Sequence, residues 1–268
     1  MNITVLANRD LASNYALNLL LPTLAADHSV QVYLSSAVGG TGQRPQELQQ
    51  LKFFEQTLFN ELLFPLLPAT RGGALCSFEQ LGQYTRTPIA ELNRINSPQG
   101  LAQLRQSQAD LILSIRYGGI LKEEAIASAA LGVINLHSGL LPDYRGVMAT
   151  FRALLAGERE IGMTLHYISD PGIDTGAIIA TTALPVEAGR SYLWHVLALY
   201  PEGCKKLLGC VASLAAGETL DTSPQAGEGQ YFSFPEQPEL DAFRARGLKL
   251  FDAEEITNFA QRYTGTQS

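Results

Sequence analysis

The chain has 268 residues, of which 46% are hydrophobic and 17% charged, typical of a globular protein with one large α/β domain or one such domain and a small appendage. No run approaches the roughly 20 apolar residues of a membrane-spanning helix, and the N-terminus has the pattern of a strand, not of a signal peptide. The net charge of −7 and the lack of a Lys/Arg cluster argue against a broad nucleic-acid surface. Three cysteines without CxxC spacing favour a reduced, cytoplasmic protein with no zinc site.

The first 35 residues have a β-α-β pattern. Asn2–Ala7 is an apolar run typical of a buried strand, and Ser29–Ser35 alternates as a second strand does. Between them, Leu11–Ala26 carries the apolar positions of a helix that Asp10 can cap. This order predicts a parallel sheet. The turn after the first strand reads ANRDLAS and lacks GxGxxG, which argues against an NAD or FAD site.

The next stretch carries few strand signals. Gly39–Arg44 is Gly-rich but has no GKS or GKT, so a flexible connection is favoured over a phosphate cradle. Gln46–Leu67 has the spacing of leucine and phenylalanine that predicts a helix. The remaining segments are a predicted surface loop at Ala69–Gly82, a mixed stretch at Thr87–Ser97 and a helix that begins at Ser97-Pro98.

Three short apolar runs in the middle of the chain end in polar residues. These predicted strands are Asp110–Arg116, Gly132–His137 and Gly162–Ser169. Ligands of open α/β sheets bind outside the carboxyl ends of the strands. Asn135, His137, Asp170 and Asp174 fall at or just after such ends. We therefore expect these polar groups to meet at one edge of the sheet.

Further helices and a hairpin complete the predicted main domain. Glu123–Ala130 and Met148–Ala156 are predicted helices, and Leu193–Ala216 is a long one. Ala177–Leu184 is expected to form a hairpin with the strand before it. The predicted fold class is α/β, with a Rossmann-like open, mostly parallel twisted sheet and helices on both faces.

A polar stretch at Gly217–Gly229 follows the long helix and marks an expected boundary. We predict a main domain at residues 1–216 and a short C-terminal appendage at residues 217–268. The appendage contains a strand-like run at Gln230–Phe234 and a final helix that reads AEEITNFAQRY. The strand-like run has two interpretations, since it can pair with its mate in a homodimer or close an edge of its own domain.

Asn135 and His137 are two residues apart on a predicted strand, so their side chains face the same side. An amide and an imidazole there can both donate to an oxygen on which negative charge develops. Asp174 lies in a turn between Gly172 and Gly176, and its carboxylate can orient the histidine or take a proton. These residues predict a site for attack on a carbonyl group. The motif offers no protein nucleophile, which favours direct transfer over a covalent intermediate.

Each motif also has a simpler interpretation. A lone histidine at the end of a strand is usually structural. The DPGIDTG segment, residues 170–176, can be a plain Asp/Gly turn or a Ca²⁺-binding loop, although it lacks the number of ligands found in an EF-hand. The occurrence of both motifs in one stretch is what favours a catalytic site.

NLHSGLLPDYRG from Asn135 and DPGIDTG from Asp170 resemble the motifs of the folate-dependent formyltransferases. This family includes glycinamide ribonucleotide formyltransferase, methionyl-tRNA formyltransferase and the sugar N-formyltransferases. YGGIL from Tyr117 is similar to the strand exit beside the family's pterin site. The resemblance covers the architecture of residues 2–209 and is specific from Asp110 to Gly176. It implies a formyltransferase catalytic domain, with 10-formyltetrahydrofolate as the donor and an amine as the acceptor.

The resemblance implies roles for the residues that match the motifs. Asn135 and His137 would polarise the formyl carbonyl and hold its oxyanion, and Asp174 would keep His137 protonated or help to remove the proton of the amine. His166, with Thr164, would support the site from the preceding strand, although core packing explains His166 nearly as well. The positions implied to contact the folate are Tyr117, Ile120, Leu121, Leu140, Ser169, Asp170 and Gly172.

Two departures from the family pattern concern the acceptor. Gly139 stands where serine is commoner, which can reshape the acceptor side. The stretch after the long helix is not basic and is shorter than the barrel domain, of roughly a hundred residues, that the tRNA enzymes carry. We therefore expect a small-molecule amine and no nucleic acid. An amino sugar attached to a nucleotide and an amino-acid-like amine, such as a siderophore precursor, are both open.

Three other functions compete with transfer to a small amine. A methionyl-tRNA formyltransferase-like enzyme is one. A 10-formyltetrahydrofolate hydrolase ranks low, because the family's deformylases usually carry an N-terminal regulatory domain and this chain starts on its first strand. The Asn135, His137 and Asp174 set argues against a non-catalytic scaffold.

Acceptor contacts are expected from Asn8–Asp10, Gly39–Arg44 and Tyr84–Arg94.

Overall fold

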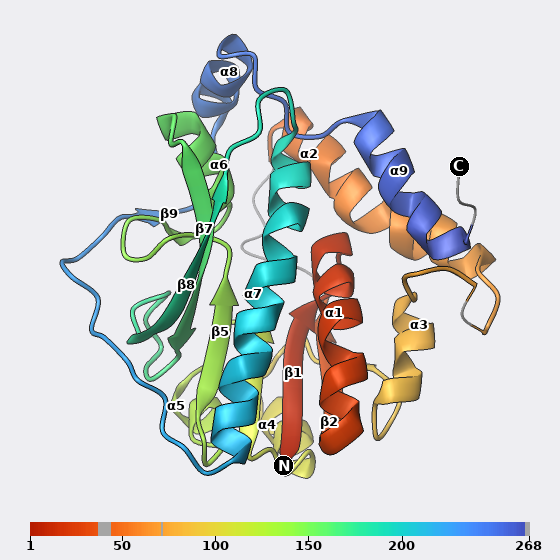
Figure 1. The fold of residues 1–268 in the computed structure, drawn as a ribbon, viewed down its shortest axis with the longest axis vertical. Helices are drawn as coiled ribbons and strands as arrows, with labels where there is room; N and C mark the ends of the chain where they lie inside the picture. The colour runs from red at the N-terminus through yellow and green to blue at the C-terminus, as the bar shows by residue number, and fades with distance from the viewer. Residues whose placement is uncertain (37–43, 71, 266–268) are drawn as a thin grey trace.

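The computed structural model describes residues 1–36, 44–70 and 72–265 and shows a twisted sheet covered by helices on both faces (Figure 1). The predicted loop Gly39–Arg44 lies outside the described residues except for Arg44. Among the helices of the described ranges, none is both long and apolar enough to cross a membrane.

The sheet has seven strands in the order β3-β2-β1-β4-β5-β7-β8. The first five in this order are parallel, β7 is antiparallel to β5, and β8 is antiparallel to β7. The predicted mostly parallel sheet is therefore confirmed. The strands are β1 (Asn2–Asn8), β2 (Ser29–Ser35), β3 (Ala90–Glu91), β4 (Leu111–Ile115), β5 (Val133–His137), β7 (Glu160–Tyr167) and β8 (Ile178–Pro185).

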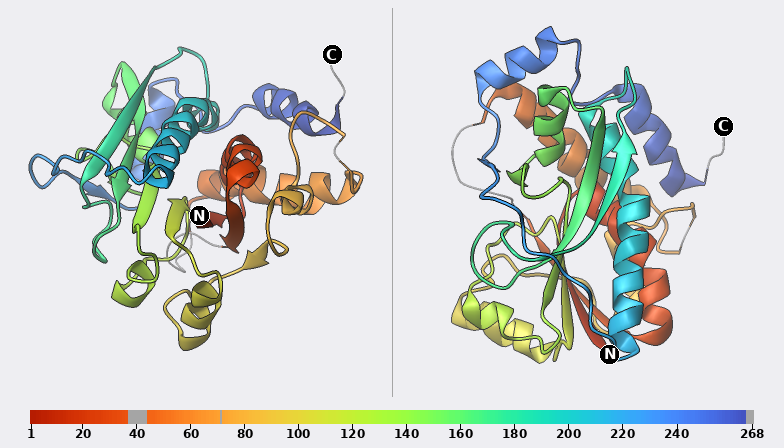
Figure 2. Two further views of the ribbon diagram at one scale, coloured as in Figure 1. Left: turned by 60° about the horizontal axis from the view of Figure 1, so that its bottom comes forward. Right: turned by 60° about the vertical axis from the view of Figure 1, so that its left-hand side comes forward.

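Two apolar cores lie on opposite faces of the sheet. Helices α1 (Leu11–Asp27) and α7 (Tyr192–Ala215) cover one face, and their leucines join the larger core. Helices α4 (Pro98–Gln106) and α5 (Glu123–Ile126) cover the other face with a smaller core (Figure 2). The predicted cap of α1 is confirmed, because the Asp10 carboxylate accepts a 2.8 Å hydrogen bond from the Ser13 N–H.

The remaining helices lie around the carboxyl end of the parallel strands and at one side of the sheet (Figure 1). The predicted helix at Gln46–Leu67 forms in three consecutive pieces with different hydrogen-bond spacing. These are α2 (Gln46–Lys52), the π-helix η1 (Phe53–Leu63) and the 3₁₀ turn η2 (Phe64–Leu66). The others are α3 (Phe78–Leu81), the 3₁₀ turn η3 (Gly82–Tyr84), α6 (Ala149–Ala156), α8 (Gln237–Ala245) and α9 (Ala253–Thr264).

Several short elements form where none was predicted. Strand β3 lies in the mixed stretch Thr87–Ser97 and has two residues, too few for an alternating pattern. Helix α3 is a single turn inside the predicted loop Ala69–Gly82, stabilised by a capping box between Ser77 and Gln80. Helix α8 lies in the predicted appendage. A predicted helix is also shorter than expected, since α5 ends at Ile126 and not at Ala130.

The segment after Gly217 packs into the same apolar core as α1 and α7. Phe243 of α8 stacks on Phe151 of α6 with ring centroids 4.5 Å apart. The Tyr263 hydroxyl of α9 donates a 2.6 Å hydrogen bond to the Asn14 side-chain oxygen. The division at residue 217 stays a prediction, but these contacts favour cooperative folding of both parts.

Strand β9 (Tyr231–Phe232) pairs in parallel with β6 (Arg145–Gly146) of the same chain. Of the two interpretations of the Gln230–Phe234 run, the structure therefore supports pairing within its own chain. The pairing brings the C-terminal segment beside the loop that follows β5 (Figure 1).

We predict that Phe243→Ala lowers the free energy of unfolding of the whole chain by about 3–5 kcal/mol, because it removes a buried ring from the shared core. Urea unfolding followed by circular dichroism measures this. Ala242→Ser, exposed on the same helix, is the control and should change little. A separate early transition of the C-terminal segment, with the main transition unmoved, would contradict cooperative folding.

Candidate active site

Asn135 and His137 lie at the carboxyl end of β5 and share one face, as predicted. Ile134 and Leu136 belong to the core beneath α1 and α7, so the alternating Asn135 and His137 face the opposite side of the sheet. Across β5, the register pairs Asn135 with His166 and His137 with Thr164. The two predicted supporting residues therefore lie directly beside the predicted catalytic pair.

Asp174 reaches this face by a route that the sequence analysis did not predict. Because β7 is antiparallel to β5, its end at Tyr167 lies opposite Ile134, near the start of β5. The expectation that three strand ends meet at one edge is therefore wrong for the third strand. The loop at residues 168–177 folds back along the sheet instead, and it carries Asp174 to the end of β5.

The Asp174 carboxylate is surrounded by groups from three segments. Its Oδ2 lies 3.5 Å from His137 Nδ1 and accepts a 2.8 Å hydrogen bond from the Gly146 N–H. Its Oδ1 lies 3.4 Å from His166 Nε2 and accepts a 3.3 Å hydrogen bond from Asn135 Nδ2. The structure thus brings together all three predicted catalytic residues and the predicted supporting residue His166.

Burial alone would raise the pKa of Asp174, but the surrounding donors reverse that effect. The charge of His137, the hydrogen bond and charge of His166 and the Gly146 N–H together lower the pKa to about 2. The backbone of Asp174 has a left-handed conformation, with φ of 54°, which is uncommon for a residue other than glycine. The carboxylate is therefore ionised at neutral pH and held in an unusual local backbone geometry.

The hydrogen-bond donors of Asn135 and His137 have acceptors within the protein. Asn135 Nδ2 donates to Asp174 Oδ1 at 3.3 Å and also lies 3.0 Å from His166 Nε2, whose role as donor or acceptor depends on the tautomer of the ring. His137 Nε2 lies 2.7 Å from the Tyr144 carbonyl oxygen, so this nitrogen must carry a proton to donate. With Asp174 beside Nδ1, both ring nitrogens of His137 face acceptors.

The loop after β5 is held against His137 by close packing. Thr164 donates a 2.7 Å hydrogen bond to the Gly139 carbonyl and accepts a 3.1 Å one from the Leu141 N–H. A Cβ at Gly139 would lie 2.8 Å from both His137 Nε2 and the Tyr144 oxygen, closer than such contacts allow. The glycine in place of serine thus permits the His137–Tyr144 hydrogen bond.

The residues predicted to contact folate have more varied surroundings. Ile120 is exposed, whereas Leu121 is buried and the Tyr117 hydroxyl donates to the Leu92 carbonyl. Asp170 accepts from the Gly172 N–H at 2.6 Å and from Thr175 Oγ1 at 3.2 Å, so it shapes its own turn. Leu140 lines a small cavity beside the loop after β5, and Ser169 lines an open cleft of about 580 Å³ beside the loop of Asp174. Contact of these residues with folate stays a prediction.

An ion cluster that was not predicted from the sequence lies at the end of the neighbouring strand β4. Arg116, after β4, pairs with Asp10 at 3.0 Å and with Glu55 of η1 at 3.2 Å. Burial and the charge of Asp10 raise the pKa of Glu55 to about 7, although Arg116 opposes this rise. The one sign of this cluster in the sequence is an arginine directly after an apolar strand. Its partners Asp10 and Glu55 are far away in the sequence, so the pairing could not be predicted.

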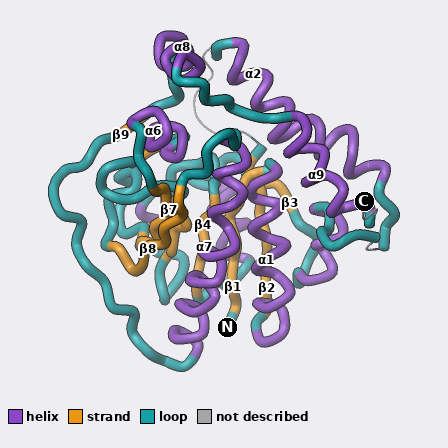
Figure 3. The backbone as a smooth tube through the Cα atoms, turned by 45° about the horizontal axis from the view of Figure 1, so that its top comes forward, coloured by secondary structure: helices purple, strands orange, loops and turns teal. Residues whose placement is uncertain are grey.

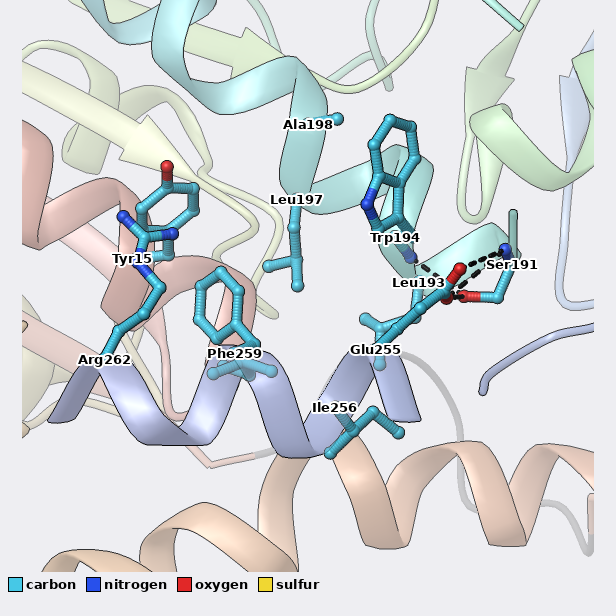
Figure 4. Close-up of a pocket in the computed structure, with 11 residues that line it drawn as sticks. Tyr15, Ser191, Leu193, Trp194, Leu197, Ala198, Glu255, Ile256, Phe259 and Arg262 are labelled. Carbon is cyan, nitrogen blue, oxygen red and sulfur yellow. Dashed lines mark hydrogen bonds between the residues drawn. The ribbon is translucent and has the colours of Figure 1, made fainter. Parts of the chain in front are cut away.

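An apolar cavity of about 190 Å³ lies between α1, α7 and α9 (Figure 4). Tyr15, Trp194 and Phe259 line it, and Glu255 at its edge bonds Ser191. None of Asn135, His137 or Asp174 is among its lining residues. The converging polar groups, and not this apolar cavity, therefore mark the candidate active site.

The low pKa of Asp174 predicts a specific loss of stability in acid. Because the folded pKa of about 2 lies below the ordinary 3.8, the ionised group adds stability that is present above pH 4 and is lost as the pH falls through 2. We expect the free energy of unfolding between pH 5 and pH 2 to fall about 2 kcal/mol more for the natural chain than for Asp174→Asn. Urea titrations at each pH, with the exposed Asp221→Asn as control, measure this, and parallel curves would contradict it.

Comparisons with known proteins agree with this site. The family model for formyl transferase matches residues 75–192, which include Asn135, His137 and Asp174. A methionyl-tRNA formyltransferase from Rhodopirellula baltica is 36% identical over 143 residues, 53% of this chain and 42% of that protein. One from Symbiobacterium thermophilum is 33% identical over 178 residues, 65% of this chain and 53% of that protein. The chain thus spans about half the length of these curated relatives.

Solved structures share the fold at low sequence identity. Glycinamide ribonucleotide transformylase 1 from Symbiobacterium toebii has a TM-score of 0.57 at 17% identity, covering 84% of this chain and 93% of that one. A sugar N-formyltransferase from a Shewanella species has a TM-score of 0.55 at 16% identity, covering 87% and 76%. Residues 75–192 of the chain therefore match the formyl transferase family model, and the chain shares the fold of these solved structures.

Proposed function

We propose that this protein transfers a formyl group from 10-formyltetrahydrofolate to the amine of a small molecule in the cytoplasm. The observation that carries the proposal is the convergence of His137, His166, Asn135 and the Gly146 N–H on the single carboxylate of Asp174. Such a buried cluster of titratable groups with a strongly lowered pKa is typical of a catalytic site. Asn135, His137 and Asp174 are also polar positions of the two motifs on which the family resemblance rests.

The reaction requires stabilisation of a negative charge on the formyl oxygen and movement of a proton, and these residues can provide both. The amine nitrogen attacks the formyl carbon, the bond from that carbon to the folate nitrogen breaks, and the proton that the amine loses passes to that folate nitrogen as tetrahydrofolate leaves. In this proposal, Asn135 and His137 stabilise the negative charge that develops on the formyl oxygen. The Asp174 carboxylate holds His137 in orientation and stabilises its positive charge while protons move.

The oxyanion role requires an exchange of hydrogen-bond partners. Asn135 and His137 donate to protein acceptors in the structure, the former to Asp174 and the latter to the Tyr144 carbonyl. A formyl oxygen bound at the end of β5 has to replace one of these acceptors. The Tyr144 carbonyl is the candidate, because it lies in the turn after β5 and is not part of a strand of the sheet.

The surroundings fit a folate that binds as a substrate. Ile120 and Ile173, on two of the segments implied to contact the pterin, have exposed fractions of 54% and 36%. Exposed aliphatic side chains of this size offer apolar surface to a flat ring, and burying them there would be favourable. The folate supplies the formyl group, and the chain orients it.

Two classes of acceptor, a small amine and methionyl-tRNA, have support from the comparisons. Solved structures that share the fold include enzymes named for sugars and for glycinamide ribonucleotide, which supports a small amine. The curated relatives are named methionyl-tRNA formyltransferases, which supports methionyl-tRNA as the alternative acceptor. The net charge of −7 favours the small amine, since tRNA binding relies on basic surface.

A single assay separates the candidate reactions. Purified protein is mixed with 10-formyltetrahydrofolate and release of tetrahydrofolate is followed with amino sugar nucleotides, amino-acid-like amines, methionyl-tRNA or no acceptor. Release that depends on a small amine supports the proposal, and release that requires methionyl-tRNA supports the alternative. Release without any amine indicates a hydrolase, and no release under any condition contradicts catalysis.

We predict that Asp174→Asn lowers kcat roughly 10²–10⁴-fold, because the neutral amide cannot stabilise the charged imidazolium or help to move a proton. Binding of a non-transferring folate analogue, measured by fluorescence quenching, should stay within a fewfold of the natural chain. The exposed Asp221→Asn is the matched control and should keep its turnover. Near-normal turnover of Asp174→Asn would remove Asp174 from the mechanism.

A further inference from the structure

We propose that Gln225 is a positioning residue that holds the backbone of the Asp174 loop in its active conformation. The proposal rests on the proposed function for its catalytic consequence, because it assumes that Asp174 acts in the reaction. Gln225 lies in the polar stretch after α7, which runs along the outer side of the β7–β8 hairpin toward β9 (Figures 1 and 3). No motif of the site includes this residue.

The Gln225 side chain makes two hydrogen bonds to the loop. Its Nε2 donates to the Asp174 carbonyl at 2.7 Å and to the Gly176 carbonyl at 2.8 Å. Both protons of one amide group are therefore directed at the two carbonyls that flank the end of the DPGIDTG turn. Among residues 221–230, all of which the structure describes, Gln225 is the one that is not exposed.

Backbone contacts fix the segment on both sides of Gln225. We call residues 223–232 the strap. At one end, Ser223 and Ile178 exchange two backbone hydrogen bonds of 2.8 and 2.9 Å. At the other end, the Arg145 N–H donates to the Gln230 carbonyl at 2.9 Å and the Val147 N–H to the Phe232 carbonyl at 3.0 Å. The strap thus joins the hairpin that carries Asp174 to the loop that carries Tyr144 and Gly146.

The strap also lies very close to the loop after β5. A Cβ on Gly229 would come within 2.0 Å of the Pro142 oxygen, and one on Gly146 within 2.1 Å of the Phe232 oxygen. Both glycines have positive φ, of 63° and 95°. Glycine is therefore required for this approach at each position. Such tight packing is typical of a fixed part of a site and not of a loose linker.

These contacts explain how the unusual backbone of Asp174 is maintained. A left-handed conformation of an aspartate is unfavourable and persists where its surroundings hold it. Gln225 holds the carbonyl of Asp174 itself, and the Gly146 N–H holds its carboxylate from the other side. Since Arg145 and Val147 donate to the strap, the intervening Gly146 N–H faces away from the strap, toward Asp174. The strap therefore aligns both the carboxylate and one of its donors.

The test uses the full chain with Gln225→Met, which keeps the length of the side chain and removes both donors. We expect kcat for formyl transfer to fall about tenfold, because a small displacement of a catalytic group has a large effect on rate. Gln225→Glu, which puts oxygen against two carbonyl oxygens, should lose at least as much at neutral pH. Ser223→Ala is the matched control, since Ser223 contacts the hairpin through its backbone.

A double-mutant cycle separates positioning from a general effect on the fold. In the Asp174→Asn background, Gln225→Met should lower kcat less than twofold, because the group that it positions is already absent. An equal tenfold loss in both backgrounds, or normal kcat in Gln225→Met, would overturn the proposal.

Amide hydrogen exchange provides a readout that needs no substrate. In Gln225→Met, the protection of the Gly146 N–H should fall about tenfold, while the Arg145 and Val147 amides keep theirs and show that the strap is still docked. Unchanged protection of Gly146 would overturn the proposal even if the chain transferred no formyl group. Loss of all three together would mean that Gln225 only anchors the strap, which also overturns it.

Discussion

The structure of the site depends on the burial of one carboxylate. The side chain of Asp174 is 11% exposed and remains ionised because two imidazoles, an amide and a backbone N–H surround it. An isolated charge in such a place would cost several kcal/mol, so each neighbour is needed for the charge to be stable. The neighbours come from β5, β7 and the loop after β5. The site therefore exists only when these segments are folded together.

The antiparallel β7–β8 hairpin is what makes this arrangement possible. If β7 were parallel to β5, the segment after β7 would begin at the carboxyl edge of the sheet, beside His137. Here β7 ends at the opposite edge, and the following loop must travel back over the sheet. A loop that lies along the sheet has no regular partners for its backbone groups. Gln225 supplies two of them, at Asp174 and Gly176.

The parts of the site that follow from local patterns could be predicted from the sequence. The shared face of Asn135 and His137 follows from the alternation of a strand, and the turn at Asp174 follows from its glycines. The direction of β7 relative to β5 could not be predicted, because an apolar run has the same pattern whether it pairs in parallel or antiparallel. Likewise, no local signal distinguishes Gln225 from the polar residues around it. Its partners are 49 and 51 positions away in the sequence.

The same limits apply to the fold and to the ion cluster at the end of β4. Long elements with many periodic positions were predicted, whereas β3, with two residues, had no pattern to detect. Arg116 continues an apolar strand in the sequence, but its φ of 56° interrupts the strand geometry there. Its charge is compensated by Asp10 and Glu55.

Two buried groups of charges thus lie side by side at the carboxyl end of the sheet. One is centred on Arg116 and the other on Asp174, and each contains its own opposite charges. The first is built mainly from the first 60 residues, and the second from β5 to β8. The two groups therefore take their charged side chains from different parts of the chain, although both lie at the carboxyl end of the sheet.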